Sequence, residues 1–332
     1  MSQIILNEMP TAHLITTRDY IPVDPCWEDC VKVLGATGVV IKDNLGGLID
    51  DFCNVDQAME GGASDSWKGI FDVAYPSLNS LPLRDQLLCF AMFCVVQRVQ
   101  SGGQYKFIEY WAGRGENTKA HDAAGLSKAV MFDKLFHASH DCLTAIGVRL
   151  WLDTLALTVE RGVVWMATQC SSFIFMSKFQ TQRKAANEFL GNVSSPFVKD
   201  GNDQMVVTSL MFFLAWLISA EPVLEQPSGS VLPKIKPLSV VLGFVKASRT
   251  ATWLGAFGAQ SAKPLQVLHV APEFSQLKRR RPKDVDAPLS YTITAQGTRK
   301  VYGKKGVMKS SEAYTPEFAA AVVAVTSALL SS

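Results

Sequence analysis

Residues 106–133, KFIEYWAGRGENTKAHDAAGLSKAVMFD, contain the pattern that decides the expected fold. Short apolar runs at 106–111 and 128–133 favour β-strands, and residues 118–124 between them favour a helix. Two glycines follow the first strand directly, and an aspartate ends the second. A strand, a glycine-rich turn, a helix and a second strand are typical of a parallel βαβ unit.

The same alternation continues toward the C-terminus. We expect further strands at 162–168, 222–227, 250–257 and 265–270, and helices at 143–158 and 205–220. Strands separated by helices predict a Rossmann-like α/β fold, in which helices cover both faces of a mostly parallel sheet. Ligands of such sheets bind beyond the carboxyl ends of the strands, so functional residues should follow the strands directly.

The N-terminal third of the chain lacks this alternation. Residues 1 to about 75 are irregular in pattern, because prolines and glycine pairs interrupt short apolar runs. Residues 81–99 are apolar on most faces and predict a buried helix, and the Ser-Gly-Gly at 101–103 marks a boundary. We therefore expect a partly helical N-terminal extension at 1–103 and a Rossmann-like domain at 104–332.

Composition excludes several classes of protein. Among the 332 residues, 48% are apolar and 19% charged, which is too apolar for a disordered chain. A net charge of +2 excludes a histone-like binder, so contact with a polyanion requires a local basic patch. Seven cysteines without a Cys-x-x-Cys pair predict an intracellular protein, nuclear or cytoplasmic, without a disulfide scaffold. The apolar run at 205–220 is too short to span a bilayer, and the N-terminus does not resemble a secretory signal, so no membrane partner is expected.

Polar residues follow the first two strands of the βαβ unit. Glu109 stands at the first strand tip, where it could accept hydrogen bonds from a ligand, and Gly113 and Gly115 let the backbone approach that ligand. Asp133 ends the next strand at the spacing at which an acid meets ribose hydroxyls. The alternatives are an ordinary βα turn and, for Asp133, a helix cap.

Two further candidates follow later strands. Cys170 comes directly after the strand at 162–168 and is a candidate nucleophile, although a lone cysteine is more often a small buried apolar residue. Glu225 lies near the end of the strand at 222–227, where a carboxyl group can donate or accept a proton. The alternative for Glu225 is a surface acid before a proline turn.

The ordered series EYWAGRG, FD, CSS and LEQP resembles the motifs of class I S-adenosylmethionine-dependent methyltransferases, in particular divergent cytosine-5 DNA methyltransferases. The resemblance covers about 104–275 and includes Lys263-Pro264 before a late strand. It implies that Cys170 attacks ring carbon 6 of cytosine, while Glu225 stabilises the protonated ring nitrogen and carbon 5 takes the methyl group. It implies that S-adenosyl-L-methionine is bound by Glu109, Tyr110, Trp111, Gly113, Gly115 and Asp133.

A nucleic-acid partner, DNA or RNA, would need the densest basic run, which consists of Lys278, Arg279, Arg280, Arg281 and Lys283. This run is equally compatible with a nuclear import signal or a solvated loop. A second basic group extends it and consists of Arg299, Lys300, Lys304, Lys305 and Lys309.

No metal site is expected, because His137 and His140 lack a third ligand and are interpreted as surface residues. Two other functions remain open. One is an inactive module that keeps the fold, and the other is a methyltransferase of proteins or small molecules that does not need Cys170.

Overall fold

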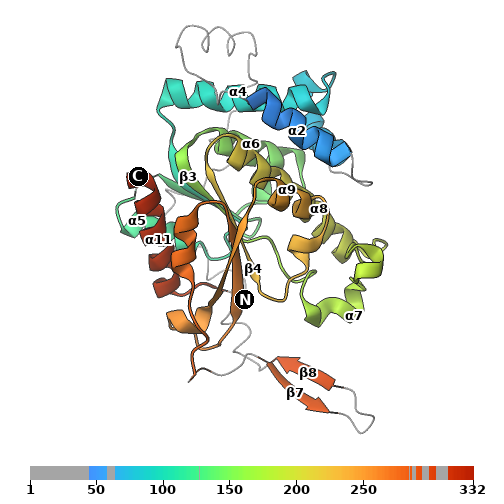
Figure 1. Cartoon of the computed structure of the whole chain (residues 1–332), viewed down its shortest axis with the longest axis vertical. Coiled ribbons are helices and arrows are strands. Elements are labelled where there is room, and N and C mark those ends of the chain that lie inside the picture. The colour runs from blue at the N-terminus through green and yellow to red at the C-terminus, as the bar shows by residue number, and fades with distance from the viewer. Residues whose placement is uncertain are drawn as a thin grey trace.

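A six-stranded sheet organises the molecule, with helices on both of its faces (Figure 1). The computed structural model describes residues 45–57, 64–126, 128–283, 285, 289–293, 299–303 and 313–332. The strands are β1 Tyr105–Tyr110, β2 Ala129–Phe132, β3 Thr158–Met166, β4 Glu221–Pro227, β5 Ser248–Trp253 and β6 Pro264–His269. Their order across the sheet is β2-β1-β3-β4-β6-β5.

Strands β2, β1, β3 and β4 are parallel, and β6 runs antiparallel to both of its neighbours, β4 and β5. The predicted mostly parallel α/β sheet is therefore confirmed. The strand order reverses between β1 and β3, which lie side by side although β2 follows β1 in the chain. Such a reversal opens a crevice beyond the strand ends, where ligands of doubly wound sheets bind.

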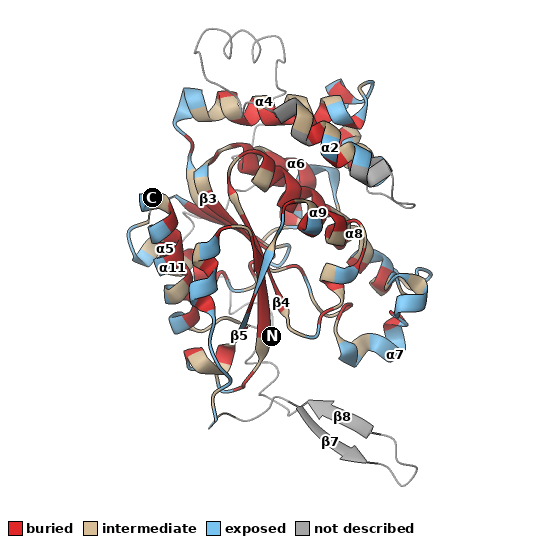
Figure 2. Ribbon diagram, viewed as in Figure 1, coloured by how far each residue is buried: buried red, intermediate tan, exposed pale blue. Residues whose placement is uncertain are grey.

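Alternate residues along the central strands enter two separate apolar cores. Ile108 and Val164 belong to one core, and their chain neighbours Phe107 and Val163 belong to the other. Figure 2 shows the resulting buried sheet between two helical layers. The layer on the first face contains α4 Leu83–Ser101, α6 Ala145–Ala156, α8 Pro196–Leu217 and α9 Leu238–Phe244, and the other contains α5 Glu116–Ala123 and α11 Pro316–Ser331.

Helices begin earlier in the chain than the sequence pattern indicates. The region described as irregular contains α2 Leu45–Gln57 and α3 Ser64–Ala74, so that expectation was wrong there. Phe52 of α2 stacks on Trp67 of α3 with ring centroids 5.0 Å apart, and the Trp67 indole N–H donates to Ser209 Oγ of α8 at 3.1 Å. Burial of these aromatic side chains stabilises both helices despite their glycines.

The helical extension therefore shares its core with the first face of the sheet. The structure also contains the short helix α7 Lys178–Thr181 and a hairpin of β7 Leu289–Ile293 and β8 Arg299–Gly303. The longer of its 3-10 helices are η7 Leu254–Phe257 and η8 Pro272–Leu277. The hairpin lies at the foot of Figure 1 and was not expected from the sequence. Arg299 and Lys300 belong to β8, whereas Lys304, Lys305 and Lys309 lie outside the described residues.

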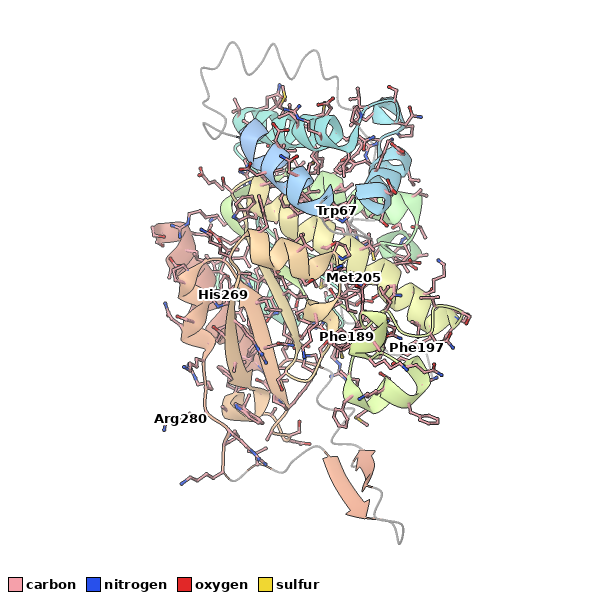
Figure 3. All side chains as sticks on the ribbon, turned by 45° about the vertical axis from the view of Figure 1, so that its right-hand side comes forward. Trp67, Phe189, Phe197, Met205, His269 and Arg280 are labelled. Atoms are coloured by element: carbon pink, nitrogen blue, oxygen red, sulfur yellow. The ribbon has the colours of Figure 1, made fainter. Side chains whose placement is uncertain are left out.

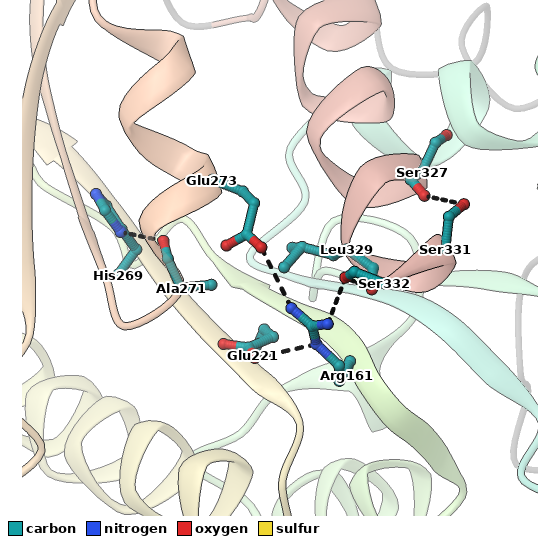
Figure 4. A network of polar contacts seen from close by, with 9 residues as sticks. All are labelled: Arg161, Glu221, His269, Ala271, Glu273, Ser327, Leu329, Ser331 and Ser332. Carbon is teal, nitrogen blue, oxygen red and sulfur yellow. Dashed lines mark hydrogen bonds and ion pairs between the residues drawn. The ribbon is translucent and has the colours of Figure 1, made fainter.

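An arginine ties the last helix to the amino-terminal ends of the central strands (Figure 4). Arg161 of β3 lies 4.0 Å from Oε1 of Glu221 on β4 and donates to Oε1 of Glu273 at 3.3 Å. It also donates to the hydroxyl of Ser332, which directly follows α11. This network fixes the end of the sheet that lies away from the glycine-rich turn.

Candidate functional site

Glu109 forms hydrogen bonds with the start of α5, the helix that follows the glycine-rich turn after β1. Its side chain is buried, and Oε1 accepts a hydrogen bond from Asn117 Nδ2 at 3.0 Å. Oε2 accepts from the backbone N–H of Thr118 at 3.0 Å and from the Thr118 hydroxyl at 2.8 Å. Burial raises the pKa of Glu109 to about 7, against the effect of these donors. Glu109 thus caps the first turn of α5 and does not face the crevice.

Tyr110 and Gly115 also lie behind the turn. The Tyr110 hydroxyl is buried and donates to the backbone oxygen of Trp151 at 2.7 Å. Gly115 has a φ of +67°, and a Cβ there would lie 2.1 Å from Sδ of Met131. Glycine is therefore favoured at 115 by both conformation and space.

Asp133 and Gly113 meet in the crevice. Oδ2 of Asp133 accepts a hydrogen bond from the backbone N–H of Gly113 at 2.9 Å, and Oδ1 accepts from the N–H of Leu135. A carboxylate has about four lone-pair positions, so Asp133 keeps acceptor capacity for a ligand. Gly113 has a φ of +59°, and a Cβ there would meet no atom within 4 Å. The backbone at Gly113 is therefore open to an approaching molecule.

Trp111, which directly follows β1, has a strained backbone. Its φ of +56° lies in the left-handed region, which is unfavourable for a bulky side chain. The indole packs edge-on against Trp151, with ring centroids 4.7 Å apart. This packing holds the Trp111 side chain at the boundary of the crevice.

The crevice consists of two adjoining chambers. The Asp133 chamber has a volume of about 240 Å³ and includes Asp133, Leu135 and His140 in its lining. The Cys170 chamber has a volume of about 380 Å³ and includes Gly113, Cys170 and Glu225. Trp111, Ala167 and Gln169 line both chambers. The structure therefore brings the tips of β1, β2, β3 and β4 to one cleft.

The loop that carries Cys170 is fixed by buried amides and hydroxyls. Gln226 Nε2 donates to the backbone oxygen of Thr168 at 2.6 Å, and Gln226 Oε1 accepts from Ser230 Oγ at 2.9 Å. The Thr168 hydroxyl lies 2.7 Å from the Thr208 hydroxyl of α8. Cys170 itself is half-buried and lines the cleft. It is therefore not buried in the core, as a purely structural cysteine would be.

Glu225 is buried in the wall of the Cys170 chamber, with only 6% of its surface exposed. Oε2 accepts a hydrogen bond from the Tyr314 hydroxyl at 2.7 Å, and Oε1 has no hydrogen-bond partner among the described residues. Burial raises the pKa of Glu225, while Lys263 and the Tyr314 hydroxyl act in the opposite direction. The alternative of a surface acid is thus wrong.

Several residues of the cleft were not singled out as functional from the sequence. Tyr314 precedes α11 and reaches Glu225 from 89 positions away in the chain, and its hydroxyl also accepts from the Trp165 indole at 3.2 Å. Gln204 of α8 is buried, lines the Asp133 chamber, and leaves its Oε1 without a hydrogen-bond partner in the described structure. No local pattern marks either residue, because both come from elements distant in sequence.

His140 was expected at the surface, and that expectation was wrong. Its ring is 1% exposed, packs against Phe132 and accepts from the backbone N–H of Asp133 through Nδ1 at 3.4 Å. His137 bonds the neighbouring Ser139 instead. In the part of the chain that the structure describes, no three metal-binding side chains come together.

The basic run at 278–283 lies on the surface beside the ends of β5 and β6. Its five cationic side chains are exposed. The Arg279 guanidinium stacks over the Phe257 ring at 5.1 Å, and Arg281 lies over Trp253 at 5.7 Å. Lys263 lines the Cys170 chamber and directly precedes β6. Leu254, which follows Trp253, donates its N–H to the Lys263 backbone oxygen, so the end of β5 lies beside the cleft. The run therefore lies at the same end of the sheet as the cleft.

Comparison with known proteins does not assign this fold to a family. No protein-family model and no curated protein sequence matches the chain. Among the described helices, none combines the length and the apolar character that crossing a bilayer requires.

Proposed function

We propose that this protein is an S-adenosylmethionine-dependent methyltransferase that modifies a cytosine of a nucleic acid through Cys170. The observation that carries the proposal is the two-chambered cleft, in which an acid bonded to a glycine turn adjoins a cysteine and a buried carboxyl group. One chamber suits a nucleoside cofactor, and the other offers a nucleophile and a proton donor.

The residues of the Asp133 chamber fit an adenosyl group. Asp133 retains acceptor capacity for the two ribose hydroxyls, and Gly113 leaves the backbone accessible. Leu135 follows Asp133 with 77% of its surface exposed, so its side chain is available to cover an apolar ring. Trp111 extends from this chamber into the next, while Glu109, Tyr110 and Gly115 position the turn. When bound, S-adenosylmethionine supplies an electrophilic methyl group.

In the Cys170 chamber, the chain's own groups can activate a pyrimidine ring. The Cys170 thiolate forms a bond to ring carbon 6, and ring nitrogen 3 takes a proton from Glu225. Burial favours the protonated form of Glu225, which this donation requires. Electron density then rises at carbon 5. After that carbon is methylated, it loses its proton to water, the carbon–sulfur bond breaks, and Glu225 regains its proton.

Calorimetry with S-adenosylmethionine tests the cofactor assignment. We expect micromolar binding by the wild type and binding about 10-fold weaker or more for Asp133→Ala, because charged hydrogen bonds to the ribose are lost. Asp65→Ala on the exposed part of α3 is the matched control and should bind as the wild type does. Absence of binding by the wild type would refute the proposal and favour the inactive module.

Transfer of a labelled methyl group tests the covalent step. The Cys170→Ser variant should bind S-adenosylmethionine with wild-type affinity but should transfer no methyl group to a cytosine-containing oligonucleotide. Transfer at the wild-type rate by this variant would remove the covalent mechanism. Cofactor binding by the wild type without any transfer to the oligonucleotide would favour a protein or small-molecule substrate.

A further inference from the structure

Apolar side chains are exposed in the segment between β3 and α8. This α7 segment, residues 172–195, contains α7 and two short 3-10 turns. Phe179 has 96% of its surface exposed and Phe175 has 52%. The other exposed large apolar residues of the segment are Met176, Leu190 and Val193. Where exposed apolar side chains form a contiguous patch, they mark an interaction surface.

Arg183 holds the α7 segment in a defined shape. Its guanidinium is buried, lies 4.4 Å over the Phe173 ring, and donates to the backbone oxygens of Ser172 and Phe189 at 2.8 and 2.7 Å. It also donates to Asn202 Oδ1 of α8 at 2.8 Å. The interior of the segment is thus organised by the hydrogen bonds of Arg183. The exposed phenylalanines do not pack into it and are available to a partner.

Cations lie beside aromatic rings of the α7 segment. A pocket of about 230 Å³ on the segment is lined by Phe175, Lys178, Lys184 and Phe189 among others. The ammonium group of Lys234 lies 5.7 Å from the centre of the Phe189 ring. Lys178 and Lys184 are both exposed. Aromatic faces interleaved with cations suit the stacked bases and phosphates of a single nucleic-acid strand, whereas an apolar protein partner would not require the charges.

The α7 segment adjoins the Cys170 chamber. The Phe173 N–H donates to the Cys170 backbone oxygen at 2.8 Å, and Val231 donates to the Phe173 oxygen. Cys170 and Ser171 line the Cys170 chamber and Phe173 lines the pocket on the segment, so the two pockets are neighbours along the chain. Figure 3 shows Arg280 at the lower left edge of the molecule and Phe189 nearer its centre. The basic run packs on Trp253 at the end of β5, whereas the α7 segment follows Cys170, so their cations lie at different places around the strand ends that form the cleft.

We infer that the substrate is a single-stranded polynucleotide that crosses the cleft from the α7 segment to the basic run. Bases stack on Phe175 and Phe179, and phosphates contact Lys178, Lys184 and Arg279 to Arg281. Cys170 and Glu225 are half-buried or buried, so a paired base would have to leave its helix to reach them, whereas an unpaired base enters directly. The inference rests on the proposed function for the reacting base, but strand binding is measured without the cofactor.

Fluorescence anisotropy with a labelled 20-nucleotide strand, and with the same strand in a duplex, tests the inference. We expect tighter binding of the single strand and affinity about 10-fold lower for Phe179→Ala. The matched control is Val99→Ala on α4, which removes another exposed apolar side chain far from the cleft and should change nothing. Replacing Arg279, Arg280 and Arg281 with Gln should reduce the slope of log affinity against log salt by about 2.

Equal affinity of Phe179→Ala and the wild type, or tighter binding of the duplex, would overturn the inference. A dimer in light scattering that Phe179→Ala dissociates would also overturn it, because the segment would then bind a second copy. Strand binding without S-adenosylmethionine binding would sustain this inference and refute the proposed function. The converse result would refute only the single-strand assignment.

Discussion

Two buried groups, Glu109 beside the first turn of α5 and His121 in its last turn, should give the folding stability opposite dependences on pH. Burial lowers the pKa of His121 to about 4 from 6.5, whereas it raises the pKa of Glu109 to about 7 from 4.5. Asn117 links them, since its side chain donates to Glu109 and its backbone oxygen accepts from His121 Nδ1. His121 also stacks on Phe107, with ring centroids 3.7 Å apart.

The two contributions have opposite signs. Between pH 7.5 and 5.0 the unfolded chain protonates His121 while the folded ring stays neutral, so acidification destabilises the fold by about 2 kcal/mol. Over the same interval the folded protein protonates Glu109 before the unfolded chain does, so acidification stabilises the fold by about 2 kcal/mol. In the wild type these effects nearly cancel.

Variants that remove one group expose the other. Glu109→Gln should lose about 2 kcal/mol of unfolding free energy relative to the wild type when the pH falls from 7.5 to 5.0. His121→Gln should gain about the same amount over this interval. Urea unfolding at both pH values measures the change, and comparison with the wild type cancels the contributions of all other groups. If both variants follow the wild-type pH profile, the assigned pKa values of Glu109 and His121 are refuted.

Three further perturbations test the cleft and its supports. Tyr314→Phe removes the donor to Glu225 and the acceptor of the Trp165 indole, so we expect a loss of about 2–4 kcal/mol in urea unfolding and a higher pKa of Glu225. An unchanged urea midpoint would argue against these two hydrogen bonds of the Tyr314 hydroxyl. Gly115→Ala places a Cβ 2.1 Å from the Met131 sulfur at a φ of +67° and should cost about 1–3 kcal/mol in thermal unfolding, more than Gly113→Ala, where no atom lies within 4 Å. Arg183→Lys cannot reproduce the branched hydrogen bonds and should make residues 172–195 cleave several-fold faster in limited proteolysis; equal cleavage rates would contradict the role of the guanidinium.

The sheet could be predicted because its strands are short apolar runs between turn residues. The expected run at 106–111 corresponds to Tyr105–Tyr110, and the run at 222–227 corresponds to Glu221–Pro227. Boundaries failed where polar residues continue an element. The helix expected at 205–220 begins at Pro196, because proline suits the first helical position. Lys199 and Asp203 form an ion pair at 2.8 Å on its exposed first turns, which adds a small stabilisation.

The positions of the candidate residues along the chain predicted their neighbourhood but not their orientation. A residue near the tip of a parallel strand must lie close to the ends of neighbouring strands, so the proximity of Cys170 and Glu225 follows from topology. Whether such a carboxylate faces the cleft or its own helix depends on local partners. Asn117 and Thr118 turn Glu109 inward, and no periodicity in the sequence encodes that choice.

The two strand-tip glutamates show how the same residue type can serve different roles. Both are buried, but Glu109 accepts three hydrogen bonds from α5, whereas Glu225 accepts one from Tyr314 and leaves Oε1 unpartnered in the described structure. A buried carboxyl oxygen without a hydrogen-bond partner destabilises the fold by about 1–3 kcal/mol. The carboxyl group lines an accessible chamber, so a ligand that bonds to Oε1 regains that free energy on binding. Under the proposed function Oε1 carries the proton, and ring nitrogen 3 of cytosine can accept it, whereas uracil presents an N–H at that position, so the chamber should discriminate between the two bases.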